Sequence, residues 1–478
     1  MTGLILFSSC RKNGVHTGDA TLQFSDKMIT FDTVFTSVST VTKALKVFNP
    51  YKSDIQTTIR LVGGATSYFS INVDGVPIQQ LKGGEVEIPA QDSIFIFIKA
   101  NINPNGVNNP LLACDTLAFT TNGKRQNVEL LAYGQDAHFI VIPTDTVRFL
   151  QEDGTVAFEI PYHAIAPEGQ EVTWKNDKPY VIYGYAMVEQ NAKLTIEKGT
   201  RVHLHKGGVL WVFDDGCLEV NGTKDEPVTF QGDRLDRWYD KDYSQWDRIW
   251  ICESNRDSKI NYAVIKNAFI GIQAETMERL KNGKLLLTNT VIKSSHLGLL
   301  AKTYTIEASN NVFMECVQSC VALTEGGDYT FVNNTICNGY LNRRGTSSLY
   351  INNFYEYEDK DKKRHIVPFD FTGNFVNNIV YGAKDSSEFS YSYVKEAKFE
   401  VSFENCLLKT TERWLANPIT HTQTLLNKSP DFENEKEYDL RLKNTSPCKR
   451  AGKSVLWLQT DIEGNIRNTS SPSIGAYE

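Results

Sequence analysis

The chain has 478 residues, more than one hydrophobic core organises, so two or more domains are expected. Its 41% hydrophobic and 22% charged residues are ordinary for a globular protein, and the mild net charge of −7 argues against nucleic-acid binding, which needs a basic domain or stripe. Frequent aromatics (25 Phe, 21 Tyr and 7 Trp) favour strands over helices, and no stretch approaches the roughly 18 apolar residues of a membrane-spanning helix.

The N-terminus carries a short apolar run, residues 4–7, followed by Ser8-Ser9-Cys10. This pattern resembles the lipobox of bacterial lipoproteins, whose Cys is acylated and becomes the first mature residue. The resemblance predicts a lipidated Cys10, a signal and tether over residues 1–19, and attachment to a bacterial outer membrane, on either its cell-surface or its periplasmic face. The run lacks the basic residues of a full secretory signal, which a gene start placed too late would explain. The alternative is a tail with a chance Cys.

Residues 20–136 alternate short strand-like runs, such as 93–98, with turn signals such as Asn122-Gly123. About seven short strands at this spacing predict an immunoglobulin-like (Ig-like) β-sandwich. The segment also resembles bacterial Ig-like domains in its Asn49-Pro50 after a strand and its closing Leu-Ala-Tyr-Gly at 131–134. Such domains act as spacers or docking modules.

A different pattern begins at about residue 179, after a predicted connector over 137–178. The phrase Leu-Thr-Ile-Glu-Lys-Gly-Thr at 194–200 is followed by Gly-Thr and Pro-Val-Thr-Phe within 222–230. These phrases resemble the opening coils of parallel β-helix proteins of the pectin-lyase-like group. The resemblance predicts an all-β chain in which a right-handed parallel β-helix, a single-stranded solenoid, spans residues 179–425.

An internal repeat supports the solenoid. An Asn followed by a short apolar strand recurs every 19 to 27 residues, as expected for one coil per repeat. Equivalent residues of stacked coils lie about 4.8 Å apart, so these Asn side chains can form a ladder, and Asn also tolerates the left-handed turn conformation. The predicted ladder comprises Asn289, Asn311, Asn334, Asn353, Asn378 and Asn405.

Residues 426–478 are predicted to cap the C-terminal end of the β-helix. Asp461, Gly464 and Arg467, with the ending Ile-Gly-Ala-Tyr-Glu at 474–478, resemble the terminal segment of many bacterial secreted β-helix proteins. We expect the three residues to be structural, forming a turn and a buried ion pair that close the final coil. The complete plan resembles Bacteroidetes-type envelope lipoproteins that combine an Ig-like domain with a β-helix.

Cysteines offer no metal or redox site. Cys217, Cys252, Cys337 and Cys406 lie within apolar strand patterns, which predicts buried free thiols. Cys316 and Cys320 have no nearby His or second Cys pair that would complete a zinc pattern. No cofactor or metal is therefore predicted.

Catalytic residues are not evident in the sequence, and none is assigned. Asp214-Asp215 is the adjacent acidic pair of the early coils, but the following Gly indicates a turn. His296, Lys302 and Arg343-Arg344 could share one face without an evident acidic cluster beside them. The alternative to a non-catalytic protein is a polysaccharide lyase or glycoside hydrolase of the pectin-lyase-like fold. A surface that collects Asp, Glu, Lys and Arg from successive coils would favour the enzyme.

An insertion at 233–246 is the predicted binding surface, because exposed Trp, Tyr and Arg are enriched at binding hot spots. A second insertion, 356–364, is a mixed charge run and is interpreted as a solvated loop. The resulting hypothesis is a non-catalytic, lipid-anchored cell-envelope protein that binds an outer-membrane protein or a glycan. Its predicted binding residues are Arg234, Arg237, Trp238, Tyr239, Tyr243 and Trp246.

Overall fold

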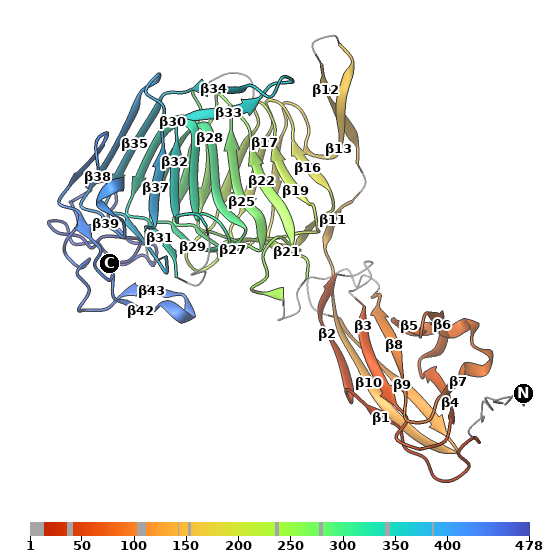
Figure 1. The fold of residues 1–478 in the computed structure, drawn as a ribbon. Coiled ribbons are helices and arrows are strands. Elements are labelled where there is room, and N and C mark those ends of the chain that lie inside the picture. The colour runs from red at the N-terminus through yellow and green to blue at the C-terminus, as the bar shows by residue number, and fades with distance from the viewer. Residues whose placement is uncertain are drawn as a thin grey trace, which may run out of the picture. The chain divides into compact units, whose positions relative to one another are not determined.

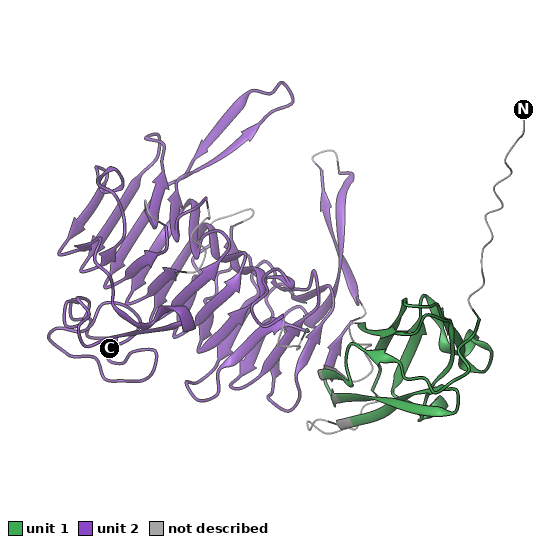
Figure 2. Cartoon of the chain, turned by 60° about the horizontal axis from the view of Figure 1, so that its bottom comes forward, with its two compact units in different colours: residues 1–137, 234–237 green, residues 138–233, 238–478 purple. Residues whose placement is uncertain are grey.

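A computed structural model describes residues 14–35, 42–102, 111–141, 143–151, 154–234, 239–276, 281–339, 345–384 and 387–478. The chain divides into two compact units, with the boundary between Ala137 and His138 (Figure 2). Among the described residues, no helix is long and apolar enough to cross a membrane. The predicted lipidation site Cys10 lies outside the described residues.

The first unit consists of two five-stranded sheets around a common core (Figure 1). One sheet has the order β1 (Gln23–Phe24), β3 (Lys43–Phe48), β8 (Ser93–Ala100), β5 (Phe69–Val73) and β6 (Val76–Pro77). The other has the order β2 (Met28–Phe35), β10 (Lys124–Gln135), β9 (Leu111–Thr121), β4 (Ile55–Leu61) and β7 (Glu85–Ile88). Short 3-10 turns occupy Gly64–Thr66, Ile78–Gln80 and Lys82–Gly84.

The alternation of buried and exposed residues along each strand explains how the first unit packs. Along β8, Ile94, Ile96 and Ile98 are buried while the residues between them are more exposed, as expected when one face of a strand meets the core. The pairings are antiparallel except that β2 pairs with β10 in parallel. A two-sheet arrangement was predicted from the strand spacing, and the Ig-like assignment stays a prediction.

The second unit is a parallel β-helix built from three stacks of strands, which we name A, B and C (Figure 1). Stack A contains β13 (Val156–Ala166), β16 (Tyr185–Val188), β19 (Val209–Val212), β22 (Trp246–Ile251), β25 (Ala268–Glu275), β32 (Leu349–Asn352) and β37 (Phe389–Ser392). Stack B contains β14 (Glu171–Trp174), β17 (Lys193–Glu197), β20 (Cys217–Asn221), β23 (Ser258–Asn261), β26 (Leu285–Thr288), β35 (Phe371–Val376), β38 (Phe399–Glu404) and β40 (Ile419–Thr422).

Two long strands, β28 (Leu297–Ser309) and β30 (Val321–Val332), pass from stack A into stack B and join both stacks into one 18-stranded sheet. Stack C is the 11-stranded sheet. It contains β11 (His138–Ile140), β15 (Tyr180–Ile182), β18 (Arg201–Leu204), β21 (Val228–Gly232), β24 (Ala263–Lys266), β27 (Val291–Ser295), β29 (Val312–Cys316), β31 (Thr335–Asn338), β36 (Ile379–Gly382), β39 (Leu407–Leu408) and β41 (Leu425–Leu426).

Columns of apolar side chains fill the interior of the coils. In stack A, Ile249, Ile272, Leu299 and Val321 come from four successive coils, pair in strand register and are fully buried. Each such side chain stabilises the fold by roughly 1.5–3 kcal/mol when it leaves water. The residues between them point outward, so each coil adds one new row to the outer face of every stack.

The β-helix begins earlier than the predicted residue 179. β11 pairs in parallel with β15, and β14 pairs with β17 in uninterrupted register, so the predicted connector supplies the first coil. Within it, β12 (Asp145–Leu150) and β13 form an antiparallel hairpin before β13 joins stack A. The connector lacks the phrases found at 194–230, which explains why its role was not predicted.

The predicted asparagine ladder is present at the turn between stacks B and C for Asn311, Asn334 and Asn378. All three are fully buried. The Asn334 Oδ1 accepts the main-chain N–H of Asn311 at 2.9 Å, and the Asn378 Oδ1 accepts that of Asn334 at 2.9 Å. Thr290 and Cys406 extend the column at either end through their side-chain oxygen and sulfur. The ladder therefore satisfies main-chain donors that have no strand partner.

Three of the predicted ladder residues occupy other positions. Asn289 and Asn405 stand one residue earlier in the turn, where both have a positive φ, and form a second, outer column with Asn310, Asn333 and Asn377. Asn353 lies at the turn between stacks A and B, where its side chain binds the main chain of Val394. The prediction is wrong for these three because the Asn-plus-strand phrase does not distinguish the two turn positions or the two corners.

Residues 426–478 do not simply close the last coil. Their 3-10 turn Glu435–Glu437 and hairpin β42 (Phe432–Asn434) and β43 (Asp439–Leu442) lead into a segment that runs along the outer face of stack C. The outer Asn column binds this segment: Asn405 donates to the Ala451 carbonyl, and Asn377 to that of Lys453. The segment also covers outward apolar residues of stack C, such as Val312 and Ile379. Its role is lateral, across several coils.

Asp461 and Arg467 have the predicted structural role, but they do not pair with each other. Asp461 is fully buried and accepts the main-chain N–H groups of Glu463, Asn465 and Glu478. Arg467 is also buried, and its ion pair at 3.5 Å is with Glu478 rather than with Asp461. The four cysteines predicted to be buried thiols are buried.

Removal of one ladder amide tests its contribution. The change Asn334→Ala leaves the buried N–H of Asn311 without an acceptor, and we expect a loss of about 1–3 kcal/mol in the free energy of unfolding. Urea denaturation followed by circular dichroism measures it. The matched control Asn374→Ala alters an exposed Asn of β35 and should change stability by less than about 0.5 kcal/mol. Equal effects of both changes would contradict a structural role of the ladder.

Candidate functional site

The predicted binding insertion is only partly a surface. Arg237 and Trp238 lie outside the described residues. Trp246 is buried at the start of β22, and its indole N–H donates to the Lys266 carbonyl at 2.8 Å. Its assignment as an exposed binding residue is wrong, because the residue after the loop has already entered the strand alternation and points into the core.

The rest of the insertion is held close to the β-helix. The Tyr239 carbonyl accepts a hydrogen bond from the Gln245 amide, and the buried Asn267 side chain donates to the carbonyls of Asp240 and Asp242. Arg234 is exposed. Tyr243 is 52% exposed and lies near His296, with the ring centroids 6.4 Å apart.

A second group of side chains gathers on the outer face of stack A. Trp250 on β22, Gln273 and Glu275 on β25 and Lys302 on β28 alternate with core residues, so all four point outward. Strand register places Trp250 opposite Gln273, and Glu275 opposite Lys302. Because coils are stacked about 4.8 Å apart, these residues form one continuous strip across three coils.

Glu275 is the centre of this strip. Its carboxylate accepts the indole N–H of Trp250 at 2.7 Å and the amide N–H of Gln273 at 2.8 Å. The Lys302 ammonium lies 3.7 Å from the same carboxylate. Arg248 completes the network by donating to the Gln273 side-chain oxygen. Glu275 is therefore the residue through which Trp250, Gln273 and Lys302 are connected.

Glu325, one coil further on, has a different environment. It occupies the turn that leads from the stack A part of β30 to the stack B part, with a φ of 58°. The Lys302 ammonium is 3.7 Å from its carboxylate, so Lys302 stands between Glu275 and Glu325. Burial raises the pKa of Glu325, nearby Glu275 adds to the rise, and Lys302 opposes it. Glu325 therefore retains its proton to a higher pH than an ordinary glutamate.

Asp214 and Asp215 extend the charged surface toward the earlier coils. As predicted, they form a turn, and Asp215 has a φ of 55°. Both carboxylates bind the Lys281 ammonium. Burial alone would raise the pKa of Asp215, but Lys281 and hydrogen bonds from Asn255 hold it below its ordinary value.

Apolar packing limits the strip on its N-terminal side. Trp211, directly opposite Trp250 in strand register, is fully buried although it points away from the interior of the coils. Phe149 of β12 and Trp250 stack on it, with ring centroids 6.4 and 4.6 Å away. The hairpin β12–β13 thus covers the outer face of the first coils, and the exposed polar strip begins at Trp250.

The strip brings together residues that the sequence did not connect. Lys302 was one of the weighed candidates, but Arg248, Gln273, Glu275 and Glu325 were not. The only available signal was their distance in sequence, since Glu275, Lys302 and Glu325 follow one another at 27 and 23 residues, close to one coil. His296 packs on Phe269 at another corner, and Arg343-Arg344 lies outside the described residues.

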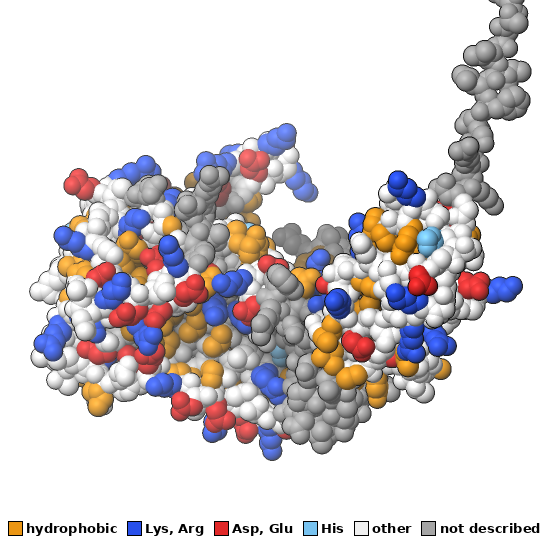
Figure 3. Space-filling view, turned by 90° about the horizontal axis from the view of Figure 1, so that it is seen from below, with side chains coloured by type: hydrophobic (Ala, Val, Ile, Leu, Met, Phe, Trp, Pro, Cys, Tyr) orange, Lys and Arg blue, Asp and Glu red, His pale blue; other side chains and the backbone are white. Residues whose placement is uncertain are grey.

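Among the described residues, no group of three or more His, Cys, Asp or Glu side chains is arranged to hold a metal ion. On the face shown in Figure 3, basic and acidic side chains are interspersed without a large region of one sign. The described chemistry is therefore that of carboxylates paired with ammonium and amide groups.

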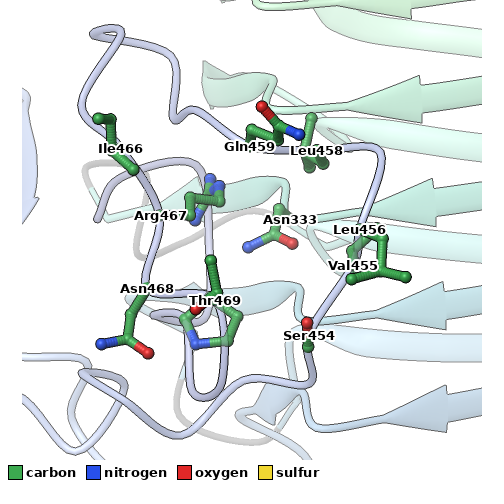
Figure 4. A pocket seen from close by; sticks show the side chains of 11 residues that line it. Asn333, Ser454, Val455, Leu456, Leu458, Gln459, Ile466, Arg467, Asn468 and Thr469 are labelled. Atoms are coloured by element: carbon green, nitrogen blue, oxygen red, sulfur yellow. The ribbon is translucent and has the colours of Figure 1, made fainter.

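A cavity of about 270 Å³ lies under the C-terminal segment (Figure 4). Asn333 and Arg467 line it from inside, and Leu456 and Ile466, which are 84% and 80% exposed, stand at its edge. The Asn333 amide binds the carbonyls of Ser473 and Gly475, and Arg467 binds that of Gly475. Since these polar groups hold the segment to stack C, the cavity belongs to the packing of this segment.

Comparison with known proteins supports the β-helix. Residues 166–268 match the profile of the pectate-lyase like beta helix domain, which covers part of the second unit. No curated protein matches the sequence. The catalytic unit of the thermostable GH87 alpha-1,3-glucanase from Streptomyces thermodiastaticus aligns with 80% of this chain and 75% of its own, at 11% identity and a TM-score of 0.27.

Two further solved structures align with shorter parts of the chain. The ASH / PapD-like domain of human CEP192 aligns with 28% of this chain and 94% of its own, at 9% identity and a TM-score of 0.17. The E. coli chaperone DraB aligns with 31% and 83%, at 6% identity and a TM-score of 0.18. At these scores, the assignment of a pectate-lyase-like parallel β-helix rests on the matched profile and on the strand stacks.

The raised pKa of Glu325 makes a pH-dependent prediction. The Glu325 carboxyl binds its proton more tightly in the folded protein than at the ordinary pKa of 4.5. The protonated side chain therefore adds to the free energy of unfolding in full below about pH 4.5, and this contribution is lost as the pH rises through the pKa of the folded state. The difference in unfolding free energy between Glu325→Gln and the wild type should therefore favour the variant more at pH 8 than at pH 4. Urea midpoints at both pH values measure this. Glu400→Gln, at a largely exposed position, is the control, and an equal difference at both pH values would refute the prediction.

Proposed function

We propose that the strip on the outer face of stack A binds a polysaccharide. The observation that carries the proposal is the row of Trp250, Gln273, Glu275, Lys302 and Glu325, supplied by successive coils and already linked by hydrogen bonds and ion contacts. A β-helix presents equivalent positions at a spacing of about 4.8 Å, which is comparable to the length of one sugar in an extended chain. A repeating ligand suits a repeating surface.

The chemistry of the strip suits sugar hydroxyls. Carboxylate and amide oxygens accept hydrogen bonds from hydroxyl groups, and ammonium, amide and guanidinium groups donate to them. Glu275 and Gln273 are nearly buried, whereas the Lys302 side chain is 35% exposed, so the network is fixed from below and reachable from outside. Fixed polar groups raise affinity because little side-chain entropy is lost on binding.

Hydrolysis is a second candidate for the same strip, favoured by two carboxylates that flank one ammonium group. Glu275 and Glu325 are each 3.7 Å from the Lys302 ammonium, and so are no more than twice 3.7 Å apart. This upper bound admits the separation of about 6.5–9.5 Å in inverting glycoside hydrolases and also that of about 5–5.5 Å in retaining ones. In the inverting case, the two residues would act as follows. Glu325 would donate its proton to the glycosidic oxygen as that bond to the anomeric carbon breaks. Glu275 would take a proton from the water that attacks this carbon.

The cell-envelope setting is part of the proposal. Lipidation of Cys10 would attach the protein to a bacterial outer membrane, with the first unit as an Ig-like spacer and the β-helix as the binding part. A glycan of the envelope, or an outer-membrane protein that carries one, would then be the partner. The exposed Tyr243 of the 233–246 insertion would provide a separate contact for such a protein.

Variants of the strip test polysaccharide binding. We expect Glu275→Gln with Lys302→Ala to weaken binding roughly tenfold, about 1.4 kcal/mol, because both donors and acceptors of the strip are altered. Native gel electrophoresis through soluble polysaccharides measures retardation. Glu307→Gln with Lys284→Ala removes a comparable ion pair from stack B and should leave binding unchanged.

The same samples report on hydrolysis. If new reducing ends appear with the wild type and disappear with Glu325→Gln, the strip is catalytic as well as binding. If none appears although the wild type is retarded, it binds without cleavage. A strip variant that is retarded like the wild type would contradict the proposed function.

Lipidation predicts a separate outcome in a bacterial host that carries the full gene. With Cys10→Ser, the protein should no longer incorporate a labelled fatty acid and should move from the membrane to the soluble fraction. Cys114→Ser, at an exposed cysteine of the first unit, should retain the label. Label retained by the Cys10 variant would show that Cys10 is not the anchor.

A further inference from the structure

We infer that the hairpin of β33 (Phe354–Glu358) and β34 (Arg364–Pro368) is an aromatic arm that binds a neutral polysaccharide beside the stack A strip. This inference rests on the proposed function and narrows it to a class of ligand. The sequence indicated a solvated charge run at 356–364. The structure shows that these residues build a two-stranded ribbon that projects from the coils (Figure 1).

The ribbon has two chemically different faces. Tyr355 pairs with Val367 and Tyr357 with His365 across the strands, so these four side chains share one face. Glu356, Glu358, Arg364 and Ile366 share the other face, where Arg364 forms an ion pair with Glu356. The charge run of the sequence therefore divides by alternation into a charged face and an aromatic face.

The aromatic rings of the first face are aligned and accessible. The planes of Tyr355 and Tyr357 differ by 21° with centroids 5.9 Å apart, and those of Tyr357 and His365 by 17° at 5.1 Å. Tyr355 and Tyr357 remain 47% and 43% exposed. The His365 ring is held in place by the Asp359 carboxylate, 2.6 Å from its Nε2. An isolated two-stranded ribbon is marginally stable in water, so a row of fixed, exposed rings on it favours a binding role.

The base of the ribbon joins the strip directly. Asn352, the last residue of β32, accepts the main-chain N–H of Glu325 at 2.7 Å, and β33 begins two residues later. At the other end of the ribbon, Phe369 and Asp370 pack against Gly326, where a Cβ would lie 2.5 Å from the Phe369 Cβ. The ribbon is thus anchored on both sides of the Glu325 turn.

Charge and shape together select the ligand. Described acidic side chains in the ion pairs along the strip and its A–B corner outnumber the basic ones, with Asp214, Asp215, Asp247, Glu275 and Glu325 facing Arg248, Lys281 and Lys302. An excess of carboxylates repels a polyuronate and leaves the hydroxyl groups of a neutral glycan as partners. Aromatic rings stack on the apolar C–H faces of pyranoses, which β-linked glucans expose on consecutive sugars.

Affinity electrophoresis of the full chain tests the arm, with hydroxyethylcellulose as a neutral β-glucan and polygalacturonate as an acidic polymer. We expect hydroxyethylcellulose to retard the wild type, and Tyr355→Ser with Tyr357→Ser to weaken that binding about tenfold. Tyr355→Phe with Tyr357→Phe keeps the rings and should retain binding. Glu356→Ser with Ile366→Ser changes the opposite face and should also retain it.

Other outcomes separate this inference from the proposed function. If the double variant Tyr355→Ser with Tyr357→Ser binds like the wild type while Glu275→Gln with Lys302→Ala does not, the strip binds polysaccharide and the arm is refuted. If the wild type is retarded by polygalacturonate alone, the strip binds a polysaccharide but the neutral ligand is refuted. If neither polymer retards the wild type, the aromatic arm binds neither a neutral nor an acidic polysaccharide and the inference is refuted. The proposed function is then decided by a wider panel of glycans.

Discussion

Hydrogen bonding between successive coils at the corner of stacks B and C is the constraint on which the second unit depends. There the chain changes direction within two residues, and the main-chain N–H groups of the turn have no strand to pair with. The buried side chains of Thr290, Asn311, Asn334, Asn378 and Cys406 supply the missing acceptors. Buried donors without partners are costly, so each coil must place its turn directly over the previous one.

Register at that corner sets the chemistry of every outer face. In a β-strand, a shift of one residue exchanges the inward and outward side chains. With the turn fixed, Ile272 and Ala274 face the interior and Gln273 and Glu275 face outward. The same alternation places Lys302 opposite Glu275 one coil later. The strip therefore follows from coil register rather than from any local motif, and its residues are far apart in sequence.

Some outer faces of the coils are covered by other segments of the chain, and others are exposed to solvent. Stack C carries apolar residues such as Val312 and Leu407 on its outside, and the C-terminal segment covers them. The first coils of stack A are covered by the hairpin β12–β13, which packs Phe149 onto Trp211. Between this hairpin and the ribbon β33–β34, the face of stack A carries charged and amide side chains. On this face, polar groups held by hydrogen bonds and ion contacts meet solvent, which is why the proposed binding chemistry is assigned to it.

Much of the architecture was contained in the sequence itself. Local alternation and the Asn-plus-strand repeat depend on neighbouring residues only, so they predicted an all-β chain with a two-sheet first unit and a solenoid. The buried cysteines followed from the same local patterns, whereas the structural role of Asp461 and Arg467 was implied by the resemblance of the C-terminal segment to those of secreted β-helix proteins. The sequence did not show that Asn289 and Asn405 stand one residue before the buried turn position, because the Asn-plus-strand phrase fits an Asn at either position of the turn.

Tertiary structure alone decided where the proposed binding surface lies. Trp246, chosen for its residue type, is in the core, whereas the unremarked Glu275 and Glu325 lie on either side of Lys302. The charge run at 356–364 became a ribbon with an aromatic face only when its two strands paired. Composition and spacing determine which residues form strands and turns. Contacts between residues more than 20 positions apart depend on the length of each coil, including its loops, and only the stacked structure fixes that length.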